Sequence, residues 1–351
     1  MTQNRLLATL LGICAAVLIF AALYLARAIL APVAFALFVI AIAWPLQRYL
    51  QGRIPKLLAL LVTVLAVLVV LTLFVSLIVW GFGRIGQWVI DNAAKFQLFY
   101  VHLTTWLEGH GFAVANQIAE SFNMSWLIRA AQQIGGRVQG LVSFIVIAFA
   151  FTVLGLLEVD ITQRNLARIE NTGKGQVLSR AGADIAAKLQ KYMLVRSVMS
   201  VLTGALIWVV TLLAGLELAT AWGVIAFVLN YIPFIGPLIA TVFPTLFAIA
   251  QFGSLELALI IFVCLNLIQF LVGSYLEPRM AGAALSLSPF LVLFAVFFWT
   301  FLWGIPGAFI GVPIVIAALT VCAEYDSTRW VATLLSGREP GKFGSGDRVL
   351  R

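Results

Sequence analysis

Long uncharged stretches alternate along this chain with shorter stretches that carry its charges. Six uncharged runs are continuous, and each can cross a bilayer as a helix, because about 20 apolar residues span a hydrocarbon core ~30 Å thick. These runs are Leu6–Ala26, Ala28–Gln47, Leu57–Gly83, Val138–Leu157, Ser197–Leu216 and Leu257–Leu276. They are apolar all round, whereas the strands of a membrane barrel alternate polar and apolar residues. The pattern predicts an all-α integral membrane protein.

Two further uncharged stretches, Leu218–Leu255 and Met280–Ala323, are interrupted in the middle by glycine and proline. The residues at the breaks are Asn230, Tyr231, Pro233, Gly236 and Pro237 in the first stretch, and Gly304 and Pro306 in the second. A straight helix of about 38 residues would be ~57 Å long, whereas each arm alone reaches only about 24 Å. We therefore expect re-entrant hairpins or discontinuous helices, which brings the total to about eight hydrophobic segments.

Such interruptions carry functional information. Lipid tolerates irregular backbone only where protein or a water-filled cavity satisfies the freed N–H and C=O groups. A matched pair of interrupted segments is also a pointer to the binding site of a transporter. The two breaks are thus the first place to look for a site.

Composition supports the membrane assignment and gives an orientation. Hydrophobic residues make up 63% of the chain and charged residues only 10%, compared with about 25% charged residues in a soluble domain. The net charge of +8 comes from Lys and Arg beside the spans, which is typical of cytoplasmic loops, so we expect no nucleic-acid partner. We expect both termini and the 158–196 loop in the cytoplasm, and residues 84–137 outside.

The expected organisation follows from these spans. It comprises transmembrane spans 1–3 in residues 1–83, an external amphipathic helical segment in 84–137, span 4 in 138–157, a cytoplasmic loop with an amphipathic helix in 158–196, a transport core with both interrupted segments in 197–323, and a partly disordered cytoplasmic tail in 324–351. In the cytoplasmic loop, Asp184 and Lys188 have the i,i+4 spacing of a helical ion pair.

Signatures of enzymes are missing from the sequence. No phosphate-binding Gly-x-x-x-x-Gly-Lys-Ser/Thr loop is present. The two histidines, His102 and His110, lack the spacing of a metal site, and the three cysteines lie singly in apolar runs. We therefore expect no catalytic residues, no metal and no cofactor.

The candidate site residues are the few polar groups at membrane depth. Asn266, Gln269 and Gly273 fall at i, i+3 and i+7 on one face of a helix, which suits either a stripe facing a solute or ion, or interhelical hydrogen bonds. At the first break, Asn230 and Tyr231 belong either to a binding site built from unwound backbone and helix ends or to a purely structural turn.

Ionisable residues at the ends of the apolar segments form a second candidate group. Glu277 and Arg279 flank a proline, and they form either a local ion pair or a gate or coupling element. Glu217 and Glu256 flank the first interrupted segment, where they are either solvated at the interface or coupled to protons.

Short motifs in a fixed order add a family resemblance. They are Trp44-Pro45-Leu46, Asn230 to Pro237, Leu276-Glu277-Pro278-Arg279-Met280, Leu287-Ser288-Pro289, and Gly304-Ile305-Pro306-Gly307-Ala308 with Gly311-Val312-Pro313. From about residue 10 to about residue 335 the chain resembles the AI-2E (autoinducer-2 exporter-like) family. The resemblance implies a multi-pass transporter of the bacterial inner membrane that forms a homo-oligomer, with a pentamer as the expected form. It also implies autoinducer-2 export or sodium(lithium)/proton antiport.

Three functional hypotheses follow. The first is a secondary transporter that exports a small polar solute, such as an autoinducer-2-like signal, by alternating access. Its site would lie between the two interrupted segments and the face of Asn266 and Gln269. The second is cation/proton antiport, with Glu217, Glu256 or Glu277 as the proton-linked carboxylate. The third is a membrane scaffold without transport activity.

Overall fold

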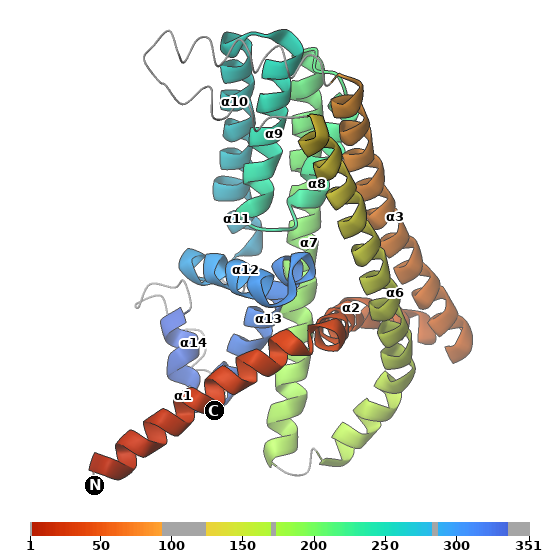
Figure 1. The fold of residues 1–351 in the computed structure, drawn as a ribbon. Coiled ribbons are helices and arrows are strands. Elements are labelled where there is room, and N and C mark those ends of the chain that lie inside the picture. The colour runs from red at the N-terminus through yellow and green to blue at the C-terminus, as the bar shows by residue number, and fades with distance from the viewer. Residues whose placement is uncertain (1, 93–123, 170–172, 283–286, 336–351) are drawn as a thin grey trace. The chain divides into compact units, whose positions relative to one another are not determined.

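The described part of the chain is built from helices (Figure 1). The structure is a computed structural model, and it describes residues 2–92, 124–169, 173–282 and 287–335. The helices are α1 (Thr2–Leu25), α2 (Arg27–Gln51), α3 (Lys56–Asp91), α6 (Met124–Ile169), α7 (Gly173–Leu213), α8 (Ala219–Leu229), α9 (Ile235–Phe252), α10 (Leu255–Gln269), the π-helix η1 (Phe270–Leu276), α11 (Glu277–Ala281), α12 (Pro289–Trp303), α13 (Ile305–Glu324) and α14 (Arg329–Leu335).

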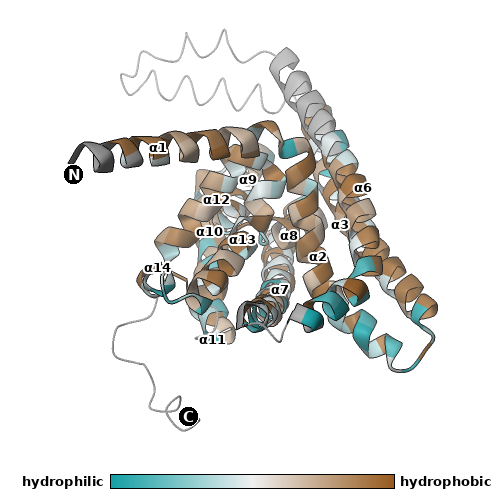
Figure 2. Cartoon of the chain, turned by 90° about the horizontal axis from the view of Figure 1, so that it is seen from below, coloured by the Kyte–Doolittle hydropathy of each residue, from teal (hydrophilic) through white to brown (hydrophobic). Residues whose placement is uncertain are grey.

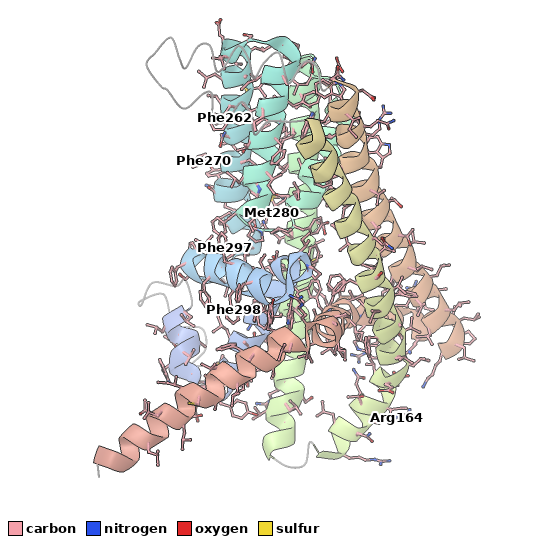
Figure 3. All side chains as sticks on the ribbon, viewed as in Figure 1. Arg164, Phe262, Phe270, Met280, Phe297 and Phe298 are labelled. Carbon is pink, nitrogen blue, oxygen red and sulfur yellow. The ribbon has the colours of Figure 1, made fainter. Side chains whose placement is uncertain are left out.

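The all-α membrane class is confirmed. Seven helical segments of the described chain are long and apolar enough to cross a membrane, and no strand occurs in the described ranges. Hydrophobic residues cover most of the helices (Figure 2). Phe262 and Phe270 point outward from α10 and η1 and are exposed, as expected for a surface that faces lipid (Figure 3).

Two helices are longer than the apolar runs predict. α6 continues to Ile169, beyond the predicted end of span 4 at Leu157, and α7 begins at Gly173, well before the predicted start of its span at Ser197. The segment expected to form an amphipathic helix in the 158–196 loop is helical as the first part of α7, and the predicted Asp184–Lys188 pair forms within it at 2.7 Å. Most of the expected external segment 84–137 and the end of the tail lie outside the described residues.

Both predicted breaks are present. The first separates α8 from α9 between Asn230 and Phe234, and the second separates α12 from α13 at Gly304, whose φ is +68°. The chain divides into two compact units. Unit 1 comprises Met1–Ala66, Phe144–Met193 and Ala281–Arg351, and unit 2 comprises Val67–Ser143 and Leu194–Met280. Each break belongs to a different unit.

In unit 2, α8 lies antiparallel to α7 at very short range. A Cβ atom on Gly204 would lie 2.8 Å from the carbonyl oxygen of Gly223 and from Cβ of Phe227, and one on Gly223 would lie 2.6 Å from Cβ of Trp208. Glycine at both positions removes the side chain that would otherwise separate the backbones. On another side of α8, Gly81 of α3 lies against Ile225. The short helix α8 is therefore enclosed, and most of its residues are buried.

In unit 1, α12 and α13 form an antiparallel hairpin. Gly307 and Gly311 of α13 lie against the backbone of Trp299 and Ala295 on α12, where added Cβ atoms would collide. The pairing of 299 with 307 and of 295 with 311 sets the antiparallel register. At the tip, the indole Nε1–H of Trp303 donates to the carbonyl oxygen of Leu23, near the end of α1, at 3.1 Å.

Pro45 explains a further contact of unit 1. Proline has no N–H, so the carbonyl four residues earlier loses its helical donor. That carbonyl belongs to Ala41, and the side-chain Nε2–H of Gln190 on α7 donates to it at 2.9 Å. The break that Pro45 makes in the hydrogen bonding of α2 is thus repaired by a neighbouring helix.

The short distance between α7 and α8 gives a test of the packing. Gly204→Ala and Gly223→Ala should each destabilise the protein by about 1–3 kcal/mol, because the added methyl group meets backbone atoms that have no room to move. Gly83→Ala is the matched control: it lies in α3 of the same unit with no neighbouring atom within 4 Å of its Cβ position. It should be neutral or stabilising by about 0.5–1 kcal/mol. Thermal unfolding in detergent measures all three, and wild-type stability of both Gly204→Ala and Gly223→Ala would contradict the close approach.

Candidate functional site

The turn between α8 and α9 is held by its own backbone. The N–H groups of Ile232 and Gly236 donate to the carbonyl oxygens of Leu229 and Ile232 at 2.9 and 3.0 Å. A side chain at Gly236 would collide with the carbonyl of Leu229, so the turn requires glycine at this position. Phe234 has φ +62°, a strained value for a residue with a side chain. Such strain persists where the surroundings fix the backbone, as is common at functional sites.

The polar side chains of this turn lie inside the protein. Nδ2–H of Asn230 donates to Oγ of Ser200 at 3.2 Å, and the hydroxyl of Tyr231 donates to Oγ of Ser197 at 3.0 Å. Asn230 is 6% exposed and Tyr231 is 8% exposed. The Tyr231 ring packs edge-on against Phe74 of α3, with 5.3 Å between ring centroids. We name Asn230, Tyr231, Ser197 and Ser200 the tip cluster.

An ion pair adjoins the tip cluster. Nη1 of Arg196, the residue before Ser197, lies 2.7 Å from both carboxylate oxygens of Glu277. The side chains are 8% and 24% exposed, respectively. Of the two alternatives for Glu277 and Arg279, the local ion pair does not form, because Glu277 reaches across to α7 and the Arg279 guanidinium lies 3.8 Å from the ring centre of Tyr275. Residues two apart on a helix point in different directions, which explains the difference.

Glu277 directly follows the π-helix η1. A π-helix is rare, and where one occurs within an α-helix it is frequently at a functional site. Gln269, the last residue of α10, is half-buried, and its Nε2 is enclosed without a hydrogen-bond partner among the described residues. Gln269 therefore retains a donor at the start of the π-helix.

The predicted stripe of Asn266, Gln269 and Gly273 is not uniform. Asn266 is exposed, and its Nδ2–H donates to the carbonyl oxygen of Phe262 in its own helix at 2.8 Å. Gly273 is exposed and lies within η1, so the α-helical spacing used to group it with the other two residues does not continue through this position. Only Gln269 of the three has an enclosed polar atom without a partner in the described chain.

Glu217 lies just before the start of α8, and Glu256 lies in the first turn of α10. The carboxylate of Glu217 accepts a short hydrogen bond from Nε1–H of Trp88, and its backbone N–H donates to Oε1 of Gln251 at 2.9 Å. Gln251 in turn donates to the carbonyl oxygen of Gly215 at 3.0 Å. Glu256 is exposed in the first turn of α10, where the helix dipole favours an acidic side chain.

The second break has a different character. Gly304 is exposed and Pro306 is half-buried, and the polar atoms at this tip are those of the backbone and of Trp303. Pro233 is buried in the turn between α8 and α9, and Pro237 lies in the first helical turn of α9. The predicted site between the two breaks would contain residues of both units. It stays a prediction.

The contribution of α7 was not predicted. Arg196, Ser197, Ser200 and Thr203 lie in its unit 2 portion. Arg196, Ser200 and Thr203 are buried and follow one another at i, i+4 and i+7. A search for polar residues at i, i+3 or i+4, and i+7, the kind of helical spacing that singled out Asn266 and Gln269, would have found this face of α7. In the described ranges, no three His, Cys, Asp or Glu residues are grouped so as to hold a metal ion.

These features define a multi-pass helical membrane protein with two broken segments and a buried polar cluster beside one of them. The profile of the AI-2E family transporters matches residues 13–327. The chain therefore belongs to the AI-2E transporter family, a family of transporters and not of enzymes, as the sequence motifs indicated.

The chain is also similar to three curated relatives. The AI-2 transport protein TqsA of Escherichia coli K12 is 24% identical over 91% of this chain and 93% of the relative. A "Putative transport protein" of Haemophilus influenzae is 27% identical over 95% of this chain and 97% of the relative. A protein of the same name from Borreliella burgdorferi is 31% identical over 57% of this chain and 56% of the relative.

The Arg196–Glu277 pair gives a prediction about stability. Arg196→Met or Glu277→Leu alone should destabilise the protein by several kcal/mol, since removing one partner of a buried pair costs ~3–5 kcal/mol by leaving the other charge unpaired. The double variant should recover much of this loss, because it leaves no uncompensated charge. Arg279→Met is the control, with an exposed arginine whose ring contact contributes only about 0.5–1 kcal/mol.

Chemical denaturation in detergent measures the four variants. If the double variant loses as much unfolding free energy as the two single variants together, the two charges act independently. That outcome would contradict the 2.7 Å contacts between them.

Proposed function

We propose that this protein is a secondary transporter that exports a small polar solute by alternating access, and that the tip cluster contributes to the solute site. The observation that carries the proposal is the burial of Asn230 and Tyr231 at an unwound turn between two apolar helices. Polar groups at membrane depth are costly, and they are commonly kept where they line a pathway. Membership in a transporter family supports the same conclusion.

The chemistry of the cluster favours a neutral, hydroxylated solute. Its groups are one amide and three hydroxyls, which donate and accept hydrogen bonds without a formal charge. Each neutral hydrogen bond contributes only about 0.5–1.5 kcal/mol net. A solute with several hydroxyl groups can therefore replace the Asn230–Ser200 and Tyr231–Ser197 bonds at little cost. TqsA is an AI-2 transport protein, which makes an autoinducer-2-like signal the first solute to test.

Gln269 and the Arg196–Glu277 pair complete the proposed site. Nε2–H of Gln269, which has no hydrogen-bond partner among the described residues, would donate to a solute oxygen. Arg196 and Glu277 would act as a gate that holds α7 against the start of α11 on one side of the tip cluster. Gly236 and Pro237 would fix the start of α9. Gly304 and Pro306 would form the break between α12 and α13 in the second interrupted segment.

Cation/proton antiport is the second candidate within transport. Glu277 is the carboxylate that favours it, because it is only 24% exposed and lies beside the tip cluster. The contact of both its carboxylate oxygens with Nη1 of Arg196 argues for a structural salt bridge in this conformation. The two candidate functions are distinguished by sodium-dependent proton flux in proteoliposomes. It is measured for Glu217→Gln, Glu256→Gln and Glu277→Gln. Flux that stays unchanged in all three variants would remove antiport through these carboxylates.

Orientation and assembly belong to the same proposal. The distribution of Lys and Arg supports cytoplasmic termini, and the family resemblance supports the bacterial inner membrane and a homo-oligomer such as a pentamer. A membrane scaffold is the alternative of another class. In that case, substitutions at Asn230 would alter assembly, and the purified protein would transport no solute.

Substitutions in the tip cluster test the proposal. Tyr231→Phe and Ser200→Ala each remove one hydroxyl, and each should lower the rate of solute transport about fivefold, which corresponds to one hydrogen bond of about 1 kcal/mol. Asn230→Leu removes an amide and should lower the rate at least tenfold. The assay is efflux from proteoliposomes loaded with furanosyl signals, polyols, amino acids or sodium.

Thr211→Val is the matched control for these variants. Thr211 is buried on α7, the helix that also carries Ser200. Its hydroxyl donates to the carbonyl oxygen of Ile207 in the same helix at 2.7 Å. This variant should transport at the wild-type rate. A loss equal to that of Ser200→Ala would indicate helix packing instead of solute binding, and full activity of Asn230→Leu would overturn the proposed site.

A further inference from the structure

Three arginines of the described chain stack on tyrosine rings one helical turn away. The guanidinium carbon of Arg27 lies 4.7 Å from the ring centre of Tyr24, that of Arg53 lies 4.2 Å from Tyr49, and that of Arg279 lies 3.8 Å from Tyr275. The spacing is i,i+3 in the first pair and i,i+4 in the other two. The same arrangement therefore occurs at three separate places along the chain.

Each pair lies where a long apolar helical segment ends. Tyr24 is near the end of α1, Tyr49 is near the end of α2, and Tyr275 is near the end of η1 after α10. All six side chains belong to exposed residues. Tyrosine and arginine at the ends of membrane helices lie at the level of the lipid headgroups. The six side chains therefore lie outside the core of this chain, and the Tyr24 ring also packs on Phe301, with 6.1 Å between ring centroids.

The three guanidinium groups also lack an acidic partner in the described chain. The acids that form ion pairs there contact Lys56, Lys188, Arg196 and Arg329. Stacking uses the flat face of a guanidinium and leaves its in-plane N–H donors for other groups. A phosphate offers the complementary charge and accepts two such donors at once.

From these observations, we propose that the three Tyr–Arg pairs bind the phosphate groups of anionic phospholipids. The tyrosine ring holds the guanidinium flat at headgroup level, and the guanidinium edge binds the phosphate. The pairs thereby fix the ends of α1, α2 and η1 at the membrane surface. This inference does not depend on the solute that the protein transports.

The test compares two triple variants in nanodiscs. Arg27→Lys/Arg53→Lys/Arg279→Lys keeps every positive charge but loses the flat, stacking fork. Arg48→Lys/Arg168→Lys/Arg180→Lys is the matched control, because these arginines are exposed and stack on no ring in the described ranges. The nanodiscs contain phosphatidylcholine with increasing fractions of phosphatidylglycerol. Retained phosphatidylglycerol is counted by native mass spectrometry, and the melting temperature is recorded in parallel.

The wild-type protein and the control should retain phosphatidylglycerol and melt at a higher temperature in its presence. The stacked-arginine variant should bind this lipid two- to fivefold more weakly per pair, which is the range of about 0.5–1 kcal/mol for an exposed cation–π contact. A third variant, Tyr24→Leu/Tyr49→Leu/Tyr275→Leu, should show the same loss with all arginines present.

Three outcomes would overturn the proposal. The first is wild-type retention of phosphatidylglycerol by the stacked-arginine variant. The second is an equal loss in the control, which would indicate a general effect of arginine. The third is equal stabilisation by soluble glycerol phosphate at the same concentration, which would indicate a site for free phosphate instead of lipid. Melting temperatures in pure phosphatidylcholine show whether the variants fold.

Discussion

Backbone that leaves helical geometry at membrane depth needs hydrogen-bond partners inside the protein, because lipid supplies none. In unit 2, this requirement is met around the turn between α8 and α9. The turn bonds to itself through Ile232 and Gly236, and its side chains bond to Ser197 and Ser200 of α7. These contacts are possible only because α7 and α8 approach closely at Gly204 and Gly223. The glycines are thus a precondition for the tip cluster, although they lie more than a helical turn away from it.

The same requirement accounts for several side-chain contacts elsewhere. Gln190 donates to the carbonyl of Ala41 that Pro45 leaves free, and Gln251 donates to the carbonyl of Gly215 after the end of α7. Trp303 does the same for the carbonyl of Leu23 near the end of α1. In each case, a helix break or end exposes a carbonyl that a side chain of another helix satisfies. The few polar residues within the apolar segments are therefore concentrated where backbone bonds are lost.

Much of the fold could be predicted from the sequence, because the length of an uncharged run and the positions of glycine and proline determine spans and breaks. The extents of α6 and α7 could not be predicted in this way. Their charged portions continue the same helices, and a rule based on uncharged runs ends each helix at its first charge. At the site, Asn230 and Tyr231 were predicted as candidates. The pairing of Arg196 with Glu277, separated by 81 residues, depends on tertiary packing, which local spacing does not encode.

For the proposed transport cycle, the strengths of the contacts around the tip imply an order of events. The Asn230–Ser200 and Tyr231–Ser197 bonds are neutral, and a hydroxylated solute can exchange with them at little net cost. The Arg196–Glu277 pair is charge-assisted and largely enclosed, so opening it requires solvation of both charges. Solute binding would therefore first separate the tip from α7 while the ion pair still holds η1 and α11 in place. Release would follow when water reaches the pair, so that the ion pair, more than the tip cluster, would set the rate of the conformational change.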